Sequence, residues 1–433
     1  MADAQPIGTA PPIAAPSDGL PRVLLVGGPP FNMNVGAGVT LTGLFGGWPR
    51  THLASAYEGD VRYDTAICDR FYSLNRFPGA SGNKWVRQLQ LLSRLALRRA
   101  DTSVFVGRVS RGLTEFVEDF RPEALFIELS SLSAIDVVIE LSRRYRLPIA
   151  VHVPDDWMPT WPRYEYRSLA YRPAVEFLNW RLQRRVNALM REASAHLAIS
   201  QSLADTLAAR HGRPFHVAYN AADPPRWPDV APRDVPPGEP LRIVYSGSIF
   251  SYGQTQSLVE TAHAVARLAA SGLPVRLDIY SQHHDDAAIR AAIQPGPAVG
   301  LYPLVPREEL GDNLRAADVL LLPTNFDQTT VDFIRHSMPG KMAEYLMAGR
   351  AVLAYGPVEV EQVRFVREHE CAVVVTEHRV AALEEAIRSL VEDASLRARL
   401  ARRARAVGLE VFDLRRVRAD FEQVITAMVR GAR

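Results

Sequence analysis

The most informative part of this chain lies near its end, where the sequence reads Ser337-Met-Pro-Gly-Lys341-Met-Ala-Glu344-Tyr-Leu-Met-Ala-Gly349. An apolar run at 317–323 precedes it and predicts a buried strand, and a polar loop follows that run. The stretch itself predicts a helix from about Gly340 to Ala348, because a glycine at 349 is typical of a helix end. The apolar run at 351–355 predicts another strand. Strand, helix and strand in this order indicate an α/β fold.

Lys341 is one of two lysines among 50 basic residues, and the other is Lys84. A lysine ammonium is a compact charge that suits a phosphate where a planar guanidinium does not fit. Lys341 falls in the first turn of the predicted helix, where free N–H groups and the helix dipole favour an anion. Glu344 follows one turn later on nearly the same face. The pair predicts contacts to a diphosphate and a ribose diol, and the alternative is an ordinary surface ion pair.

The stretch resembles the donor-sugar motif of GT-B glycosyltransferases, in particular the retaining family 4, in which the pattern reads P-S-K-x-x-E-Y-x-A-x-G-x-P-V. The resemblance implies that Glu344 binds the nucleotide ribose and that Lys341 binds the pyrophosphate, with Ser337 and Gly340 in the same donor-binding segment. One position departs from the family. The family often carries a first Glu eight residues before the second, and here His336 stands there. We expect either that His336 or the nearby Asp332 takes over its contacts or that the contacts to the sugar differ.

Length and composition are typical of a globular protein of two or three domains, with 433 residues of which 47% are hydrophobic. No apolar run reaches the length of a membrane-spanning helix, and residues 1–20 resemble a disordered tail rather than a secretory signal. Cys68 and Cys371 lie far apart in apolar runs, which predicts reduced core thiols. These features together predict a cytoplasmic protein.

The net charge of +2 conceals an asymmetry: residues 21–222 carry +7 and residues 223–433 carry −3. A basic first half suggests an anionic partner. Nucleic acid is not expected, because the basic residues do not alternate with aromatic residues and no nucleic-acid module is recognisable.

Apolar strand-like runs alternate with helical patterns on both sides of one proline-rich segment. That segment, 223–240, holds seven prolines in eighteen residues and predicts a linker. Strands alternating with helices imply parallel sheets. The runs expected as strands in the first half are 22–27, 64–68, 124–127, 148–152, 195–199 and 215–219, and those in the second half are 241–245, 275–280, 299–302, 319–322, 352–354 and 372–375.

This arrangement matches the GT-B plan of two Rossmann-like domains facing each other across a cleft, with a C-terminal helix that crosses back to the first domain. We therefore expect a short tail, an acceptor domain, a linker, a nucleotide-sugar donor domain and a returning helix. The boundaries follow as 1–20, 21–222, 223–240, 241–410 and 411–433.

Two glycine-containing loops follow the first predicted strand of each domain. The first contains Gly28, Asn34, Gly36 and Gly38, but it does not complete the dinucleotide pattern G-x-G-x-x-G, which argues against a nicotinamide enzyme. In the GT-B family this loop contacts the acceptor or the donor phosphates, and the alternative is a structural turn. The second, Gly247–Ser248, resembles the family's phosphate loop. The Arg and Lys that the family often places there are absent.

His152, Asp155 and Asp156 end another predicted strand, where ligands of open α/β sheets bind. They resemble the family's His-Asp site, which contacts the transferred sugar. A divalent metal site is an alternative, although the family generally needs no metal and we expect no cofactor. Asn220-Ala-Ala-Asp223 resembles the family's hinge between domains.

The segment Lys84–Arg99 predicts a helix with one apolar stripe and a basic opposite side. Such a helix can lie on an anionic membrane, and the alternative is ordinary packing on the sheet.

These patterns predict a glycosyltransferase that moves a sugar from a nucleotide donor, with UDP or GDP favoured, to an acceptor hydroxyl. The resemblance implies retention of configuration, and a lipid-linked acceptor in cell-envelope or polysaccharide synthesis would suit the basic first half. Two alternatives remain: a catalytically inactive GT-B scaffold that serves as a partner subunit, and a non-hydrolysing nucleotide-sugar 2-epimerase, which shares the fold but not the Pro-x-Lys-x-x-Glu segment.

Overall fold

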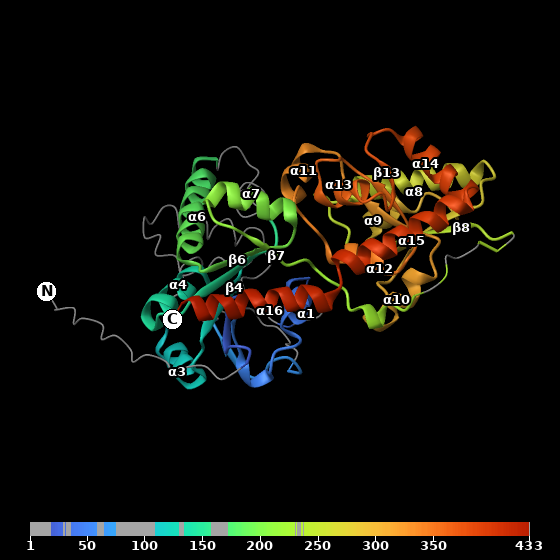
Figure 1. Ribbon diagram of the computed structural model, residues 1–433. Helices are drawn as coiled ribbons and strands as arrows, with labels where there is room; N and C mark the ends of the chain where they lie inside the picture. Colours follow the sequence, from blue (N-terminus) through green and yellow to red (C-terminus); the bar gives the residue numbers. More distant parts are fainter. Residues whose placement is uncertain are drawn as a thin grey trace, which may run out of the picture. The chain divides into compact units, whose positions relative to one another are not determined.

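The computed structural model divides the chain into two compact units, Met1–Ala218 with Val417–Arg433 and Tyr219–Arg416 (Figure 1). It describes residues 19–28, 31, 36–58, 65–74, 109–129, 134–156, 172–229, 231, 235–236 and 238–432. Most of the predicted tail, Asn34 and the segment Lys84–Arg99 lie outside the described residues.

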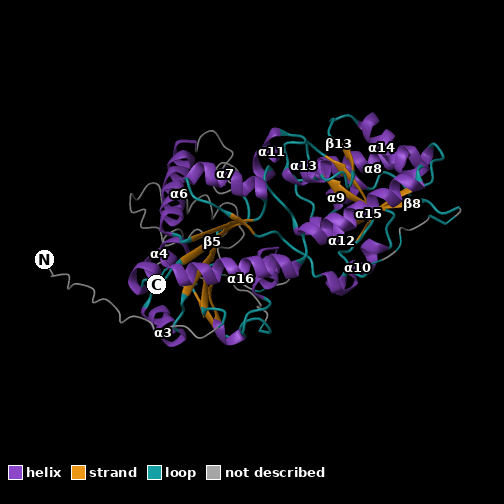
Figure 2. Ribbon diagram, viewed as in Figure 1, coloured by secondary structure: helices purple, strands orange, loops and turns teal. Residues whose placement is uncertain are grey.

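The first unit is built on a parallel sheet, part of which is drawn in orange beside the label β5 in Figure 2. Its strand order is β3-β2-β1-β4-β5-β6-β7. Its central strands are entirely buried, which explains their continuous apolar runs. The strands are β1 (Val23–Val26), β2 (Leu53–Tyr57), β3 (Phe71–Ser73), β4 (Ala124–Glu128), β5 (Ile149–Val153), β6 (Ala195–Ala198) and β7 (His216–Val217). The helices are α1 (Gly36–Phe45), α3 (Arg111–Phe120), α4 (Ala134–Tyr145), α6 (Arg172–Glu192) and α7 (Gln201–His211), with a short 3-10 helix at Arg50–His52.

The predicted strand at 64–68 is wrong. Residues 65–67 form a turn, and the strands of this region are β2 and β3, on either side of it. Cys68 is buried, and its Sγ lies 3.4 Å from the carbonyl oxygen of Leu53. The turn itself is largely exposed, and Cys68, which directly follows it, is the residue that packs into the core.

The second unit contains a parallel sheet with the order β10-β9-β8-β11-β12-β13. The strands are β8 (Leu241–Ser246), β9 (Val275–Tyr280), β10 (Val299–Tyr302), β11 (Val319–Pro323), β12 (Ala351–Tyr355) and β13 (Val373–Val375). The helices are α8 (Thr255–Ala270), α9 (Ala287–Ile293), α10 (Arg307–Arg315), α11 (Gln328–Ile334), α12 (Gly340–Met347), α13 (Glu361–Glu368), α14 (Val380–Glu392) and α15 (Ala394–Val411), and a 3-10 helix spans Pro224–Arg226. Helices α8 and α14 pack together, and α12 packs on α15.

Helix α16 (Leu414–Gly431) returns to the first unit, as the GT-B plan predicts. Its Phe421 is buried, with its ring centroid 4.9 Å from that of Phe45 and 5.9 Å from that of Phe126. Arg418 Nε donates to the carbonyl oxygen of Gly43 at 3.0 Å. The end of the chain thus completes the core of its first half.

The chain connects the two units twice, and the two connecting segments are hydrogen-bonded to each other within the second unit. Ala222 N donates to Phe412 O at 3.0 Å, and Leu414 N donates to Ala222 O at 3.0 Å. The Asn220 side chain donates to Met338 O at 3.1 Å, in the loop that leads to α12. The predicted hinge element is therefore in direct contact with the segment that carries Lys341.

Both cysteines are free and buried, as predicted. Within the part of the chain that the structure describes, no helix is long and apolar enough to span a bilayer.

Candidate active site

Gly247 directly follows β8 and has a backbone that only glycine adopts easily. Its φ is +147°, and a Cβ at this position would lie 2.9 Å from Lys341 Nζ and 3.4 Å from the Tyr245 hydroxyl oxygen. The missing side chain therefore lets the ammonium of Lys341 approach the loop backbone. This close approach brings together two segments that the sequence separates by more than ninety residues.

Lys341 lies in the first turn of α12 and points to the end of β8. Its Nζ donates to the Tyr245 hydroxyl at 2.9 Å and lies 4.3 Å from the centroid of the Tyr245 ring. The same hydroxyl donates to Ser248 O at 2.6 Å and accepts from Gln254 Nε2 at 2.9 Å. The ammonium is thus held over the Gly247–Ser248 loop, and the structure records no surface ion pair between Lys341 and Glu344.

Tyr345 fixes α12 against the end of β8. The Tyr345 side chain is buried, and its hydroxyl accepts a hydrogen bond from Ser246 N at 2.9 Å. Burial raises the pKa of this phenol, which keeps it protonated. Gly349 ends the helix with a φ of +62°, as predicted. The N-terminus of α12, with no side-chain cap, consequently lies beside the Gly247–Ser248 backbone and suits an anion.

Glu344 lies one turn beyond Lys341 and is mostly buried. Burial raises the pKa of its carboxyl, while the nearby charges of Arg307 and Lys341 act in the opposite direction. Arg307 NH1, at the start of α10, lies 3.9 Å from Glu344 Oε1. A carboxylate in such a setting gains from hydroxyl donors, which a ribose diol supplies.

Hydrogen bonds to Asn325, which is almost fully buried, stabilise the loop between β8 and α8. Asn325 N donates to Gly253 O at 2.8 Å, and its Nδ2 donates to Ser251 O at 3.0 Å. Its Oδ1 accepts from Ser257 N at 3.2 Å, in the first turn of α8. The loop after Gly247 therefore has a defined conformation.

Other predicted donor residues surround α12. Ser337 N donates to Ile334 O at 2.9 Å, and Gly340 is the exposed first residue of the helix. His336 is half-buried in the turn between α11 and α12, four residues before that helix begins. The predicted donor residues thus lie on α12 and on the turn that leads into it.

In the first unit His152 lies inside β5 rather than after it. Its side chain is fully buried, with Nδ1 3.8 Å from Glu128 Oε1, and neither ring nitrogen has a hydrogen-bond partner among the described residues. Asp156 accepts both terminal nitrogens of Arg210 at 2.6 Å and so ties the end of β5 to α7. Asp155 is half-buried beside it. No group of three or more His, Cys, Asp or Glu side chains that could hold a metal occurs among the described residues.

The first glycine loop is described only in part. Gly28 has a φ of +73°, Gly36 begins α1 and Gly38 is buried within it. The free N–H groups of α1 therefore start at Gly36, and the contact predicted for this loop stays a prediction.

Three side chains that contact the predicted site residues were not predicted from the sequence: Tyr245, Gln254 and Arg307. Tyr245 and Gln254 lie on either side of the predicted phosphate loop, which was the available signal. The contact of Arg307 with Glu344 depends on how α10 and α12 pack, and no local pattern shows it.

Comparisons with known proteins identify a family domain in the second unit and related folds. Residues 240–393 match the family model described as Glycosyl transferases group 1. No curated protein sequence matches the chain.

Among solved structures, HepE from Anabaena in complex with UDP has a TM-score of 0.61 and 14% identity, and the match covers 94% of this chain and 100% of that one. Sucrose-phosphate synthase from Thermosynechococcus elongatus has a TM-score of 0.63 and 12% identity over 95% of this chain and 100% of that one. WaaG, a glycosyltransferase involved in lipopolysaccharide biosynthesis, has a TM-score of 0.56 and 13% identity over 93% and 99%. At these identities the likeness shows the GT-B fold.

Proposed function

We propose that this protein, a glycosyltransferase with a group 1 domain at residues 240–393, transfers a sugar from a nucleoside diphosphate to an acceptor hydroxyl with retention of configuration, as family 4 enzymes do. The observation that carries the proposal is the convergence of Lys341, the N-terminus of α12 and the Gly247–Ser248 backbone. All three favour a diphosphate. Support comes from HepE of Anabaena, whose structures hold UDP and UDP-glucose.

In the proposed reaction the bond from the sugar's anomeric carbon to the diphosphate oxygen breaks, and the acceptor oxygen bonds to the same carbon on the same face. The acceptor proton passes to the departing diphosphate. Lys341 and the loop amides stabilise the negative charge that develops on the leaving group. Glu344 holds the ribose, which fixes the donor for attack. We assign no step to a metal or cofactor.

His336 and Asp155 are the proposed contacts for the sugar and the acceptor, since both are partly accessible. His152 and Asp156 are proposed to shape the end of β5 rather than to touch substrate, because one is fully buried and the other is paired with Arg210.

The proposed acceptor is an anionic, lipid-linked sugar diphosphate on the cytoplasmic side of a membrane, in cell-envelope or polysaccharide synthesis. The charge of +7 over residues 21–222 supports an anionic acceptor for the first unit. Contact with an anionic membrane through Lys84–Arg99 belongs to the same proposal.

Thermal shifts with UDP, GDP, ADP and dTDP test the donor site. A ligand at 100 times its Kd stabilises the folded state by about 2.7 kcal/mol. We expect one diphosphate to raise the Tm of the wild type, and Lys341→Ala to weaken its affinity by about ten- to a hundredfold. Arg388→Ala, which removes an exposed cation on α14, is the matched control and should bind as the wild type does.

Slow release of free sugar from the matching nucleotide sugar would separate an active enzyme from an inactive scaffold. A wild type that binds no nucleotide, or Lys341→Ala with unchanged affinity, would contradict the proposed donor site.

A further inference from the structure

Three aromatic rings beside the candidate donor site have no part in the chemistry above. Phe250 and Tyr252 belong to the loop after Gly247–Ser248, and Phe333 belongs to α11. The rings of Phe250 and Tyr252 are stacked, with centroids 5.5 Å apart and planes inclined by 11°. Tyr252 meets Phe333 edge to face, with centroids 5.0 Å apart. We call these three residues the aromatic shelf.

The aromatic shelf is open to water. Phe250 and Tyr252 are each 39% exposed, although both are large and stacked on one another. Single exposed apolar residues are common on protein surfaces, but a contiguous, ordered pair in a loop more often marks a binding surface.

The loop that carries two of these rings is preorganised. Phe250 O accepts hydrogen bonds from Gly253 N and Gln254 N, both at 3.1 Å. Ile249 N donates to His283 Nδ1 at 3.3 Å, which ties the loop to the end of β9. Together with Asn325, these bonds fix the ring positions before any ligand arrives, so binding would cost little ordering entropy.

The aromatic shelf joins the two segments that carry the diphosphate site. Gln254, one turn from Phe250, donates to the Tyr245 hydroxyl that holds Lys341. On the other side, Phe333 lies in the last turn of α11, which leads directly to α12. By chain length the Cα atom of Phe250 is within about 11 Å of that of Gly247. A sugar attached to a diphosphate at Lys341 therefore has these rings within its reach.

We propose that the aromatic shelf binds the apolar face of the hexose ring that the donor carries. The inference rests on the proposed function and names the sugar subsite of the same donor site. The C–H groups on one face of a pyranose carry partial positive charge, and the faces of aromatic rings are negative. Such rings select a sugar by the arrangement of its axial and equatorial hydroxyls, because an axial hydroxyl on that face prevents stacking.

Calorimetry with a nucleotide and its sugars tests the proposal. The probes are UDP, UDP-glucose, UDP-galactose and UDP-N-acetylglucosamine, or the corresponding GDP compounds if the thermal screen selects GDP. We expect Phe250→Ala and Tyr252→Ala to lower the affinity for the preferred nucleotide sugar by about three- to tenfold. The affinity for the nucleotide without its sugar should not change. Tyr252→Phe should restore affinity, and Tyr252→Leu should not. Phe177→Ala, which removes one ring of another exposed stacked pair in the first unit, should change neither affinity.

Equal losses for nucleotide and nucleotide sugar would overturn the proposal, because the loop would then act on the phosphates. A change confined to the KM of the acceptor would also overturn it, since the aromatic shelf would then hold the acceptor. Failure of the wild type to bind any nucleotide would instead contradict the proposed function itself.

Discussion

At the residue scale, the proposed donor site depends on how the ammonium of Lys341 is held. Lys341 does not extend into solvent; it lies against the ring and hydroxyl of Tyr245, and Gln254 donates to the same hydroxyl. The predicted phosphate loop at Gly247–Ser248 carries no Arg or Lys of its own. Tyr245 therefore positions the cation that this loop lacks, and a glycine at 247 leaves the space for it.

Tyr245→Phe is expected to keep the ring under Lys341 but to remove the hydroxyl. Affinity for UDP should fall by about three- to tenfold, since one hydrogen bond to a charged group is lost, while affinity for uridine should not change. Tyr355→Phe is the control, because it also removes a buried hydroxyl at the end of a strand, one that donates to Glu260 Oε2. Calorimetric titration of all three proteins measures this. Equal effects of the two substitutions on UDP would refute the positioning role.

Glu344→Gln is expected to weaken the binding of UDP and to raise the stability of the ligand-free protein. We expect UDP affinity to fall by about tenfold or more, because the ribose hydroxyls lose a charged acceptor. The ligand-free variant should be more stable than the wild type at neutral pH. Burial raises the folded-state pKa of Glu344, so its contribution to stability is present at low pH and is lost as the pH rises through that pKa.

The Tm difference between Glu344→Gln and the wild type should therefore grow with increasing pH and vanish on acidification, in scans from pH 4 to 8. UDP affinity of the wild type should fall on acidification over the same interval. A pH-independent Tm difference would show that the carboxyl is not held in a desolvated site.

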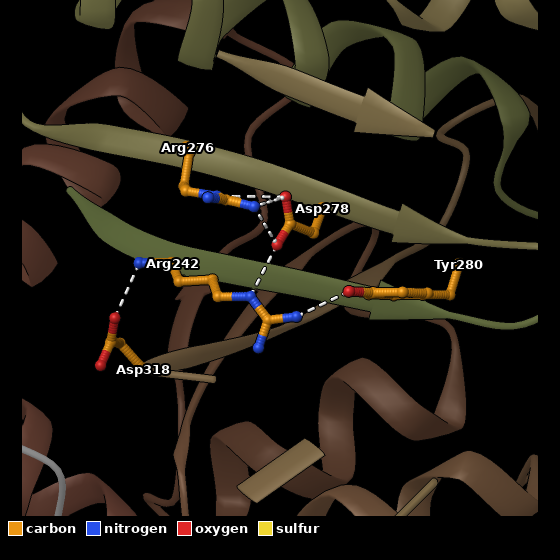
Figure 3. A network of polar contacts seen from close by, with 5 residues as sticks. All are labelled: Arg242, Arg276, Asp278, Tyr280 and Asp318. Atoms are coloured by element: carbon orange, nitrogen blue, oxygen red, sulfur yellow. Dashed lines mark hydrogen bonds and ion pairs between the residues drawn. The ribbon is translucent and has the colours of Figure 1, made fainter. Parts of the chain in front are cut away.

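At the element scale, one polar network replaces apolar packing on a face of the second sheet (Figure 3). Asp278 in β9 is almost fully buried, and it accepts from Arg242 Nε at 2.6 Å and from Arg276 NH2 at 2.7 Å. Arg242 also donates to the Tyr280 hydroxyl at 2.8 Å, and its backbone N donates to Asp318. Strands β8 and β9 thus share one buried carboxylate, which explains how charged residues occupy central strand positions.

Asp278→Ala should lower the free energy of unfolding by about 3–5 kcal/mol, because Arg242 keeps a mostly buried charge without its partner. Arg276→Ala removes a more exposed partner of the same carboxylate and should cost about 1 kcal/mol or less. Urea unfolding followed by circular dichroism gives both values. Similar costs for the two substitutions would mean that burial does not govern this network.

At the scale of the whole molecule, the chain's last helix belongs to its first unit. Phe421 of α16 packs among Phe45, Trp48 and Phe126, so the first unit lacks part of its core without α16. The hydrogen bond between Ala222 and Phe412 holds together the two segments that connect the second unit to the first. Each unit has its own sheet and core, which favours separate unfolding transitions.

Phe421→Ala is expected to destabilise the first unit by about 3–5 kcal/mol, the usual cost of removing a buried aromatic ring. Scanning calorimetry should show a lower transition temperature for the first unit, while UDP still raises the transition temperature of the second. Leu409→Ala, on the exposed side of α15, is the control and should leave both transitions in place. If Phe421→Ala lowers both transitions equally, the two units unfold as one.

The sequence by itself determined the α/β alternation, the helix that begins at Gly340 and ends before Gly349, and the resemblance of that segment to a donor-sugar motif. These features depend on neighbours within about ten residues, so periodicity and end signals are enough to show them. The same local evidence failed at 64–68, because an apolar turn that joins two strands resembles a short strand.

Only the tertiary structure decided which side chains meet. It placed Tyr245 under Lys341, Arg307 beside Glu344, His152 inside the core and Arg210 on Asp156. It also brought Phe333 onto Tyr252 and α16 onto the first unit. These contacts join residues that are distant in the chain, and packing and burial select them. No local window of sequence contains that information.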